Sequence, residues 1–353
     1  MDKKFNLDLI WNYGSIVIIG AGGLSLNYLI AYSFSSTGLG VFNQIYAFFV
    51  IFGQFAVVGI HYSVLKSVAK EDKISEQAVI IGAAVMFALP IGVSVSAIVF
   101  LSSGWIGVFF ESALVGEGIL YASLGLTFFA VNKILLSALN GRRDMVEFAV
   151  FQALRVIALL VGGVVLATVD ANIAALGYLF LFSESILLIC LVIVFFKRGL
   201  LALGGNTRTW IRHHSIFGMK SVVGGFLAES QIRIDILMLG FFVSDSLVGI
   251  YSFASTLGEG FFNLLVVVRN NVNPVLVRLL RSRDIGAIKK LVARIQICIY
   301  PAAILVGMLM VGVFPIFIEL FFSDTVYVQS IDVLIILVFG FVVYAGFLPF
   351  DFS

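Results

Sequence analysis

Residues 224–242 read GGFLAESQIRIDILMLGFF, a stretch with the length and apolar flanks of a membrane-spanning helix but with polar groups in its middle. These groups are Glu229, Gln231, Arg233 and Asp235. A charge in the middle of a bilayer is costly unless it faces protein, water or a partner. At about 100° per residue, Glu229 and Arg233 share one helix face, and Gln231 and Asp235 share the nearly opposite face. We therefore expect an interior helix, wedged between other helices and a wet cavity.

The composition of the whole chain also indicates a membrane protein. Of its 353 residues, 61% are hydrophobic and 12% are charged, about half the charged share of a soluble domain. Apolar stretches of about 20 residues cross a bilayer as helices, and these stretches do not alternate every second residue as the strands of a membrane β-barrel do. We predict an all-α polytopic membrane protein with about ten transmembrane helices. The expected spans are residues 11–34, 39–62, 77–101, 118–139, 146–169, 172–196, 219–243, 247–270, 292–317 and 331–349.

The positions of the basic residues predict the orientation. All but two of the 22 lysines and arginines fall before the first span or in or near every second connection, and the opposite connections carry acidic residues. Because cytoplasmic loops collect Lys and Arg, the N-terminus is expected in the cytoplasm. The two exceptions, Arg155 and Arg233, lie within spans. The basic amphipathic segment 275–294 is expected to lie on anionic membrane lipids.

A weak internal repeat predicts two lobes. The segment STGLGVFNQIY at 36–46 is similar to DSLVGIYSFAS at 245–255, and Pro90 in the third span corresponds to Pro301 in the ninth at nearly the same offset. Matches that keep their order and spacing are typical of transporters built from two parallel copies.

The repeat divides the chain into an N-terminal six-helix lobe, residues 1–200, and a C-terminal lobe of four helices, residues 201–353. Counterparts of the fifth and sixth spans would fall beyond Ser353. We therefore expect the second lobe to be incomplete, and a natural ten-span variant is the alternative.

Two segments resemble a known family. Asp235-Ile-Leu-Met-Leu-Gly, followed by an acidic turn and Val-Gly-Ile-Tyr-Ser-Phe-Ala at 248–254, is similar to the centre of bacterial polysaccharide-biosynthesis flippases, and 132–155 is similar to their fourth and fifth spans. These O-antigen and capsule translocases belong to the multidrug/oligosaccharidyl-lipid/polysaccharide exporter superfamily. The resemblance covers nearly the whole chain, which departs from the family by ending two helices short.

The resemblance implies both an architecture and a substrate. The architecture is two six-helix lobes around a cavity that opens alternately to each side of the bacterial inner membrane. The substrate is an undecaprenyl-pyrophosphate-linked oligosaccharide repeat unit. A polysaccharide polymerase and glycosyltransferases are the implied neighbours.

The charges within the spans form the candidate substrate site. A cluster of Arg233, Arg155 and Lys133 would suit a pyrophosphate headgroup, because guanidinium and ammonium groups pair with phosphate oxygens. Glu229, four residues before Arg233, belongs to this set. The alternatives are structural: Glu229 and Arg233 form an ion pair that only holds the bundle, and Arg155 and Lys133 reach the cytoplasmic interface along their aliphatic stems.

Three acids are candidates for coupling transport to an ion gradient. The family resemblance favours Asp235, while Glu184 and Glu259 lie near the middle of the sixth and eighth spans without a basic neighbour on their own helix. A carboxyl that changes protonation as the cavity opens couples transport to H⁺, and the same group can instead bind Na⁺. The alternative is a packed group with no coupling role. No other cofactor is expected, because no His or Cys lies at metal-ligand spacing.

Two rival functions follow from the same residues. An ion-coupled multidrug or small-molecule exporter of the same superfamily would use intramembrane acids but has little use for buried arginines. A membrane glycosyltransferase or polymerase would need a long catalytic loop, and the outer connections are short, so no enzyme activity is expected. The chain has no Walker motif, and nothing in it indicates nucleic-acid binding.

Overall fold

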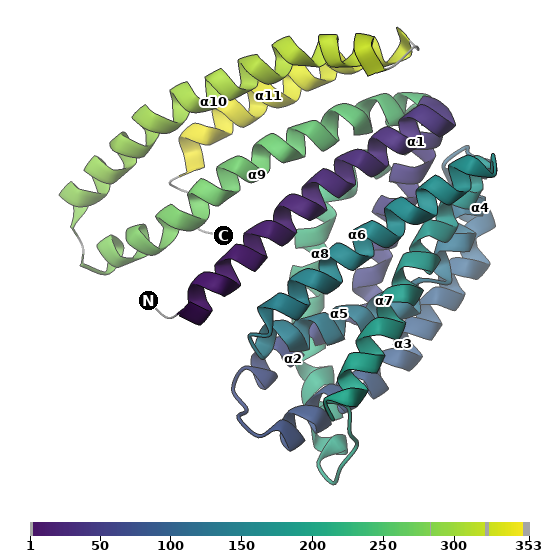
Figure 1. Cartoon of the computed structure of the whole chain (residues 1–353), viewed down its shortest axis with the longest axis vertical. Coiled ribbons are helices and arrows are strands. Elements are labelled where there is room, and N and C mark those ends of the chain that lie inside the picture. The colour runs from purple at the N-terminus through teal and green to yellow at the C-terminus, as the bar shows by residue number, and fades with distance from the viewer. Residues whose placement is uncertain (1–2, 283, 322–324, 349–353) are drawn as a thin grey trace. The chain divides into compact units, whose positions relative to one another are not determined.

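The computed structural model describes residues 3–282, 284–321 and 325–348, and every regular element in these residues is a helix. The chain forms two compact units, Met1–Gly249 and Ile250–Ser353. Figure 1 shows long helices in each unit. The predicted fold class, an all-α polytopic membrane protein, is confirmed.

The first unit is a bundle of helices together with the first turn of α9. A buried apolar cluster on α2, α3, α5 and α7 forms part of its core, around Ile60, Ile80, Ile134 and Leu191. Its elements are α1 (Lys3–Val57), α2 (Ile60–Val68), α3 (Ile74–Phe109), α4 (Ala113–Ser123), α5 (Leu126–Gly141), α6 (Met145–Thr168), η1 (Ile173–Gly177), α7 (Tyr178–Lys197), α8 (Thr207–Phe242) and the start of α9 (Asp245–Ser282).

Helix α1 is a hairpin rather than a straight rod. Ser35 interrupts it with φ 65° and ψ −178°, outside the helical region. In a straight helix Asn27 and Asn43 would be about 24 Å apart at about 1.5 Å per residue, yet Nδ2 of Asn43 donates to Oδ1 of Asn27 at 3.0 Å. The two arms of α1 are therefore the first two predicted spans. The two amides join these arms, which is the structural role that interhelical amides commonly have in membranes.

The ten predicted spans can each be found in the structure. By length and apolarity, seven described helices can cross a membrane, or eight if α4 and α5, which are bent by 53° at their junction, form one span. That count takes the two arms of α1 as one helix and leaves out α8, the helix with charges in its middle. Counting both arms and α8 accounts for all ten.

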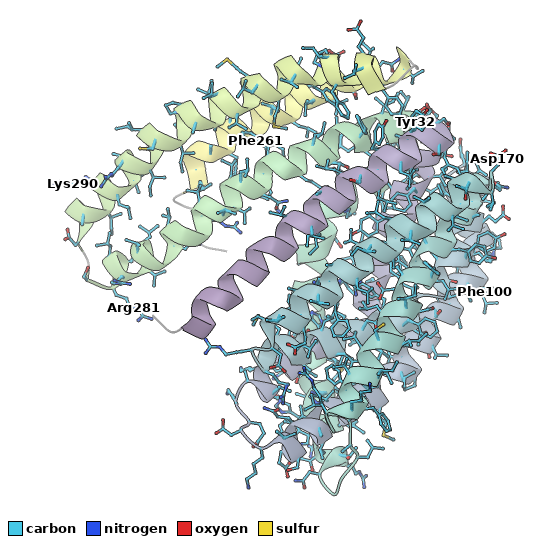
Figure 2. All side chains as sticks on the ribbon, in the orientation of Figure 1. Tyr32, Phe100, Asp170, Phe261, Arg281 and Lys290 are labelled. Atoms are coloured by element: carbon cyan, nitrogen blue, oxygen red, sulfur yellow. The ribbon has the colours of Figure 1, made fainter. Side chains whose placement is uncertain are left out.

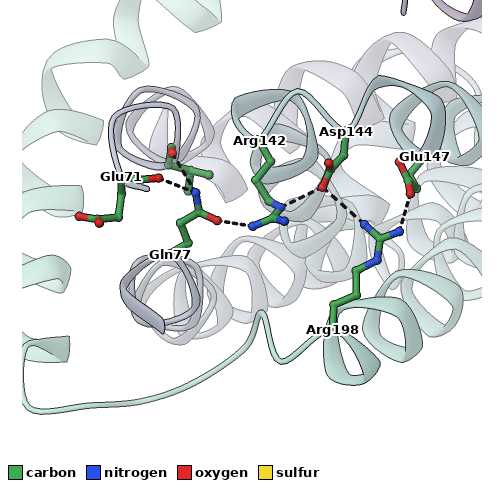
Figure 3. Close-up of polar contacts among 7 residues, drawn as sticks. Glu71, Gln77, Arg142, Asp144, Glu147 and Arg198 are labelled. Carbon is green, nitrogen blue, oxygen red and sulfur yellow. Dashed lines mark hydrogen bonds and ion pairs between the residues drawn. The ribbon is translucent and has the colours of Figure 1, made fainter. Parts of the chain in front are cut away.

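Polar contacts join three connections at one end of the first unit, which we name the basic end (Figure 3). Arg142, after α5, donates from Nη1 to Gln77 at the start of α3 and from Nε to Asp144 at 2.8 Å. Asp144 also accepts from Nη1 of Arg198 at 3.5 Å, and Nη2 of Arg198 donates to Glu147. The charges therefore hold the ends of α3, α5, α6 and α7 together.

The outer surface of the helices is apolar. Trp105 on α3 is 80% exposed and Phe242 at the end of α8 is 79% exposed. Large apolar side chains of this kind project from many helices (Figure 2). Such a surface is unfavourable in water and is the expected one in lipid.

The second unit contains the rest of α9, then α10 (Ile285–Phe321), η2 (Thr325–Gln329) and α11 (Ser330–Phe347). Phe261, Ala303 and Ala345, one from each helix, belong to its buried core. Figure 2 shows Arg281 near the end of α9 and Lys290 near the start of α10, so these basic residues share one end of the unit.

The repeat partners Pro90 and Pro301 both lie inside long helices. Pro90 is in α3, which has 36 residues, and Pro301 is in α10, which has 37. The prolines remove a backbone donor from each helix at a similar place.

Candidate functional site

A cavity of about 530 Å³ lies within the first unit, toward the basic end. Lys133 on α5, Arg155 on α6 and Arg233 on α8 all line it, so three helices bring these basic residues together. No Asp or Glu is among the described residues of the lining. Neither Arg155 nor Lys133 is turned away from the cavity. The remaining lining residues are Tyr46, Val50, Gln54, His61, Tyr62, Leu65, Phe129, Leu136, Ser137, Asn140, Phe148 and Gln152.

Arg155 is held by a carboxylate from another helix. Its Nε lies 2.9 Å from Oε1 of Glu184 on α7, and its Nη2 lies 3.4 Å from Oε2. Asn132 on α5 fixes this carboxylate by donating from Nδ2 to Oε2 and to the backbone oxygen of Glu184, both at 2.8 Å. The side chain of Glu184 is only 4% exposed, whereas that of Arg155 is 21% exposed. Glu184 is therefore a buried support behind a cation that faces the cavity.

Aromatic rings contact all three cations. The ring of Phe129 lies 5.6 Å from Nζ of Lys133 and 5.7 Å from Cζ of Arg155. Cζ of Arg233 lies 4.8 Å from the ring of Tyr46 on α1. A cation over a ring face is attracted by the ring's quadrupole, so these rings lower the repulsion among like charges.

Neither Phe129 nor Tyr46 was predicted from the sequence. Phe129 and Lys133 are four residues apart on α5, a spacing that places side chains together on a helix and was a usable signal. Tyr46 is distant from Arg233 in sequence, and no local pattern joins them. Position 53 must also be a glycine for Phe129 to keep its place, because a Cβ there would overlap the ring of Phe129.

The remaining predicted residues have different places. The backbone of Glu229 is helical, but its side chain lies outside the described residues, so the predicted pair with Arg233 is not described. Asp235 is partly buried on α8 and is not among the described lining of the cavity. Glu259 lies on α9 in the second unit. Among the three acidic candidates, Glu184 has a described contact with a cation of the cavity.

A second polar cluster joins α1, the α3–α4 turn and the first turn of α9. Asp245 accepts hydrogen bonds from Nε2 of Gln44 at 2.7 Å and from Oγ of Ser112 at 2.6 Å. A Cβ on Gly40 would overlap the backbone oxygen of Asp245, and one on Gly249 would overlap the backbone oxygen of Ser36. The repeat-related glycines Gly40 and Gly249 are therefore at one close contact. Gly40 and Gly249 occupy the same place in the similar segments 36–46 and 245–255, but the sequence did not predict their contact.

The helices are arranged as they are in solved transporters of the MOP superfamily. An inward-facing multidrug resistance MATE family transporter matches with a TM-score of 0.70 at 12% identity, covering 93% of this chain and 80% of that one. A eukaryotic MATE transporter matches with 0.59 at 13% identity, covering 98% and 82%. A MOP superfamily transporter from Pyrococcus furiosus, described as having a binding pocket of reverse polarity, matches with 0.50 at 15% identity, covering 98% and 81%. At such identities the likeness establishes the fold.

The sequence itself identifies the family. Residues 35–331 match the family described as polysaccharide biosynthesis protein, and the chain belongs to that family, as the resemblance of its central segments indicated. No curated protein matches the sequence significantly. The structural neighbours named above are transporters, and this chain is a multi-pass membrane protein that shares their fold.

Proposed function

We propose that the protein moves undecaprenyl-pyrophosphate-linked oligosaccharide repeat units across the bacterial cytoplasmic membrane by alternating access, with its N-terminus in the cytoplasm. The products would serve O-antigen, capsule or exopolysaccharide synthesis. One observation carries the proposal: Lys133, Arg155 and Arg233 line a single cavity whose described lining contains no carboxylate. Gathered cations repel one another, and an anionic headgroup offsets that repulsion.

The lining supplies partners for each part of such a headgroup. The guanidinium groups of Arg155 and Arg233 offer paired donors that match phosphate oxygens, and Lys133 adds a compact charge. Glu229 would orient Arg233 from the same helix. Gln54 and Asn140 also line the cavity and present amides, which both donate to and accept from sugar hydroxyls.

Glu184 gives the site a natural competitor for its ligand. A phosphate that takes donors of Arg155 competes with the carboxylate 2.9 Å away, and a proton or Na⁺ arriving at Glu184 would release the arginine. Glu184 is thus the coupling acid with a described link to the cavity, and Asp235 and Glu259 are the other candidates. Transport in vesicles should then require a proton or sodium gradient, and equal transport without either gradient contradicts this role.

The alternative is an ion-coupled exporter of drugs or small molecules, and its supporting observation is the fold shared with multidrug transporters. A cationic drug would meet three like charges at this cavity, so ligand charge separates the two functions. Purified protein should bind farnesyl pyrophosphate, a short analogue of the lipid carrier, more tightly than farnesol. Tight binding of a cationic dye with no binding of farnesyl pyrophosphate would favour the exporter.

The test in cells replaces the central arginine. Arg233→Ala should abolish surface polysaccharide in a strain that lacks the native gene, while Arg233→Lys should retain part of it. Arg208→Ala is the matched control, because Arg208 is an exposed arginine on the same helix that does not line the cavity. Normal polysaccharide with Arg233→Ala, at an unchanged protein level in the membrane, removes Arg233 from the substrate path.

A further inference from the structure

A second cavity lies at the basic end of the first unit, between α2 and α8. Its volume is about 300 Å³, which is roughly the share of ten water molecules in the liquid. Helix α2 separates it from the larger cavity: His61, Tyr62 and Leu65 line the larger one, whereas Lys66 and Ser67 line this one. We name it the α2–α8 pocket. It is lined by Lys66, Ser67, Lys70, Glu71, Trp210, His213 and Phe217.

The pocket carries a positive charge that its own acid does not cancel. Lys66 and Lys70 are four residues apart, and both are exposed. In the described part of the chain neither forms an ion pair. The carboxylate of Glu71 is turned to the loop, where its Oε1 accepts from the backbone N–H of Lys73 at 3.0 Å. Two ammonium groups therefore remain to receive an anion.

The other wall of the pocket is aromatic. Trp210 packs edge-on to His213 with ring centroids 5.3 Å apart, and Nζ of Lys66 lies 5.6 Å from the ring of Phe217. Indole rings are enriched where the headgroups of a bilayer meet its hydrocarbon core. An ammonium pair beside an indole at the basic end, which the positive-inside rule makes the cytoplasmic end, matches the inner-leaflet interface.

Helix α8 also carries an exposed apolar stripe. Ile216, Met219, Val223 and Leu227 are all exposed, and their spacing places them on one stripe of the helix. The stripe is centred about 100° or more around the helix from Trp210 and Phe217. A soluble phosphate has no use for such a surface, whereas the acyl chains of a lipid do.

We propose that the α2–α8 pocket binds the headgroup of an anionic phospholipid of the inner leaflet. Lys66 and Lys70 pair with the phosphate, Trp210 lies at the level of the glycerol, and the acyl chains run along the exposed stripe of α8. The site is separate from the cavity of the three cations, so it does not depend on the identity of the transported substrate.

Trp210 provides its own probe. Trp11→Phe with Trp105→Phe leaves it as the single tryptophan of the chain. This variant is reconstituted in phosphatidylcholine vesicles that contain a minor fraction of a brominated lipid. The brominated lipid is either phosphatidylglycerol or phosphatidylcholine, at the same fraction in both cases, with the bromine near the ester end of the acyl chains. Since each lysine at an anionic surface adds an appreciable attraction, Trp210 should report about a tenfold or greater preference for the brominated phosphatidylglycerol.

Charge variants decide whether the pocket is the cause. Lys66→Gln with Lys70→Gln should bring quenching by the two lipids close to equality. The control pair, Lys73→Gln with Lys197→Gln, removes two exposed lysines outside the pocket lining and should keep the preference. Equal quenching in the parent protein, or the same loss in the control pair, overturns the proposal. The proposal is also overturned if added inorganic phosphate relieves the quenching of Trp210 by brominated phosphatidylglycerol, because the pocket would then be a site for soluble anions.

Discussion

The pair of Arg155 and Glu184 allows a prediction whose size follows from burial. Removing one partner of a buried ion pair costs about 3–5 kcal/mol, because the other charge is left without compensation. The side chain of Glu184 is 4% exposed, while that of Arg155 is 21% exposed and faces the cavity. Arg155→Gln strands the more buried charge and should lie near the upper end of that range. Glu184→Gln should fall below it, at about 1–3 kcal/mol, since water in the cavity can solvate Arg155.

The glutamine of Glu184→Gln has nearly the same shape as glutamate and can keep the hydrogen bond from Asn132. Asn132 donates to Oε2 of Glu184, and the side-chain oxygen of a glutamine at that position can still accept this bond. The amide nitrogen then replaces Oε1 beside Nε of Arg155, so the loss in Glu184→Gln comes from the contact with Arg155 and not from the bond with Asn132. Combining it with Arg155→Gln removes both charges, so the double variant should be more stable than Arg155→Gln alone.

The assay is thermal unfolding of the detergent-solubilised protein, with each kcal/mol worth on the order of 2 °C for a large chain. Arg155→Gln should lower the midpoint by several degrees, Glu184→Gln by less, and the double variant should recover part of the loss. Strictly additive losses in the double variant would refute the reasoning, because they would mean that the two charges are not coupled. A larger loss for Glu184→Gln than for Arg155→Gln would refute the assignment of the buried partner.

Two further predictions concern the supports of the bundle. His214, near the start of α8, donates from Nε2 to the backbone oxygen of Ile80 at 3.1 Å, and burial lowers its pKa to about 4. As the pH drops from about 6.5 to about 4, the histidine is protonated in the unfolded state but not in the folded state, so the free energy of unfolding should fall by up to about 3 kcal/mol. His214→Gln should flatten that part of the pH profile. Gly40→Ala should lower both stability and transport, because its Cβ overlaps the backbone of Asp245. Gly104→Ala, with open space around it, should be neutral or slightly stabilising. Melting curves and polysaccharide output of the two variants measure this difference, and equal behaviour of the two variants contradicts the close contact.

The sequence indicated the fold because the bilayer restricts what a chain can do. Apolar length and the positions of lysines and arginines are enough to locate spans, and all ten expected ones can be found. The break inside α1 was less accessible. Ser35 adopts φ 65° although serine carries no strong preference for it, and the break depends on packing between the two arms. A local pattern does not encode such a turn.

The candidate site was partly visible for a related reason. Arg155 and Arg233 stood out because they violate the distribution that the other basic residues obey, so their cost in lipid called for a cavity. The residues that hold these arginines in place follow no comparable pattern in the sequence. Glu184 and Asn132 lie on different helices, and their contact depends on how α5, α6 and α7 pack. Sequence reasoning therefore found the charges but not the groups that fix them.

The unequal support of the three cations bears on how a substrate would be released. Arg155 pairs with the carboxylate of Glu184, and the ring of Phe129 contacts both Arg155 and Lys133. A guanidinium with no competing carboxylate would hold an anionic headgroup more tightly and release it more slowly. Glu184 lowers that affinity by competing for one guanidinium, since both partners need the same donors. We therefore expect Glu184→Gln to bind farnesyl pyrophosphate more tightly than the parent protein while transporting less. Weaker binding in that variant would instead mean that the carboxylate acts only by positioning Arg155.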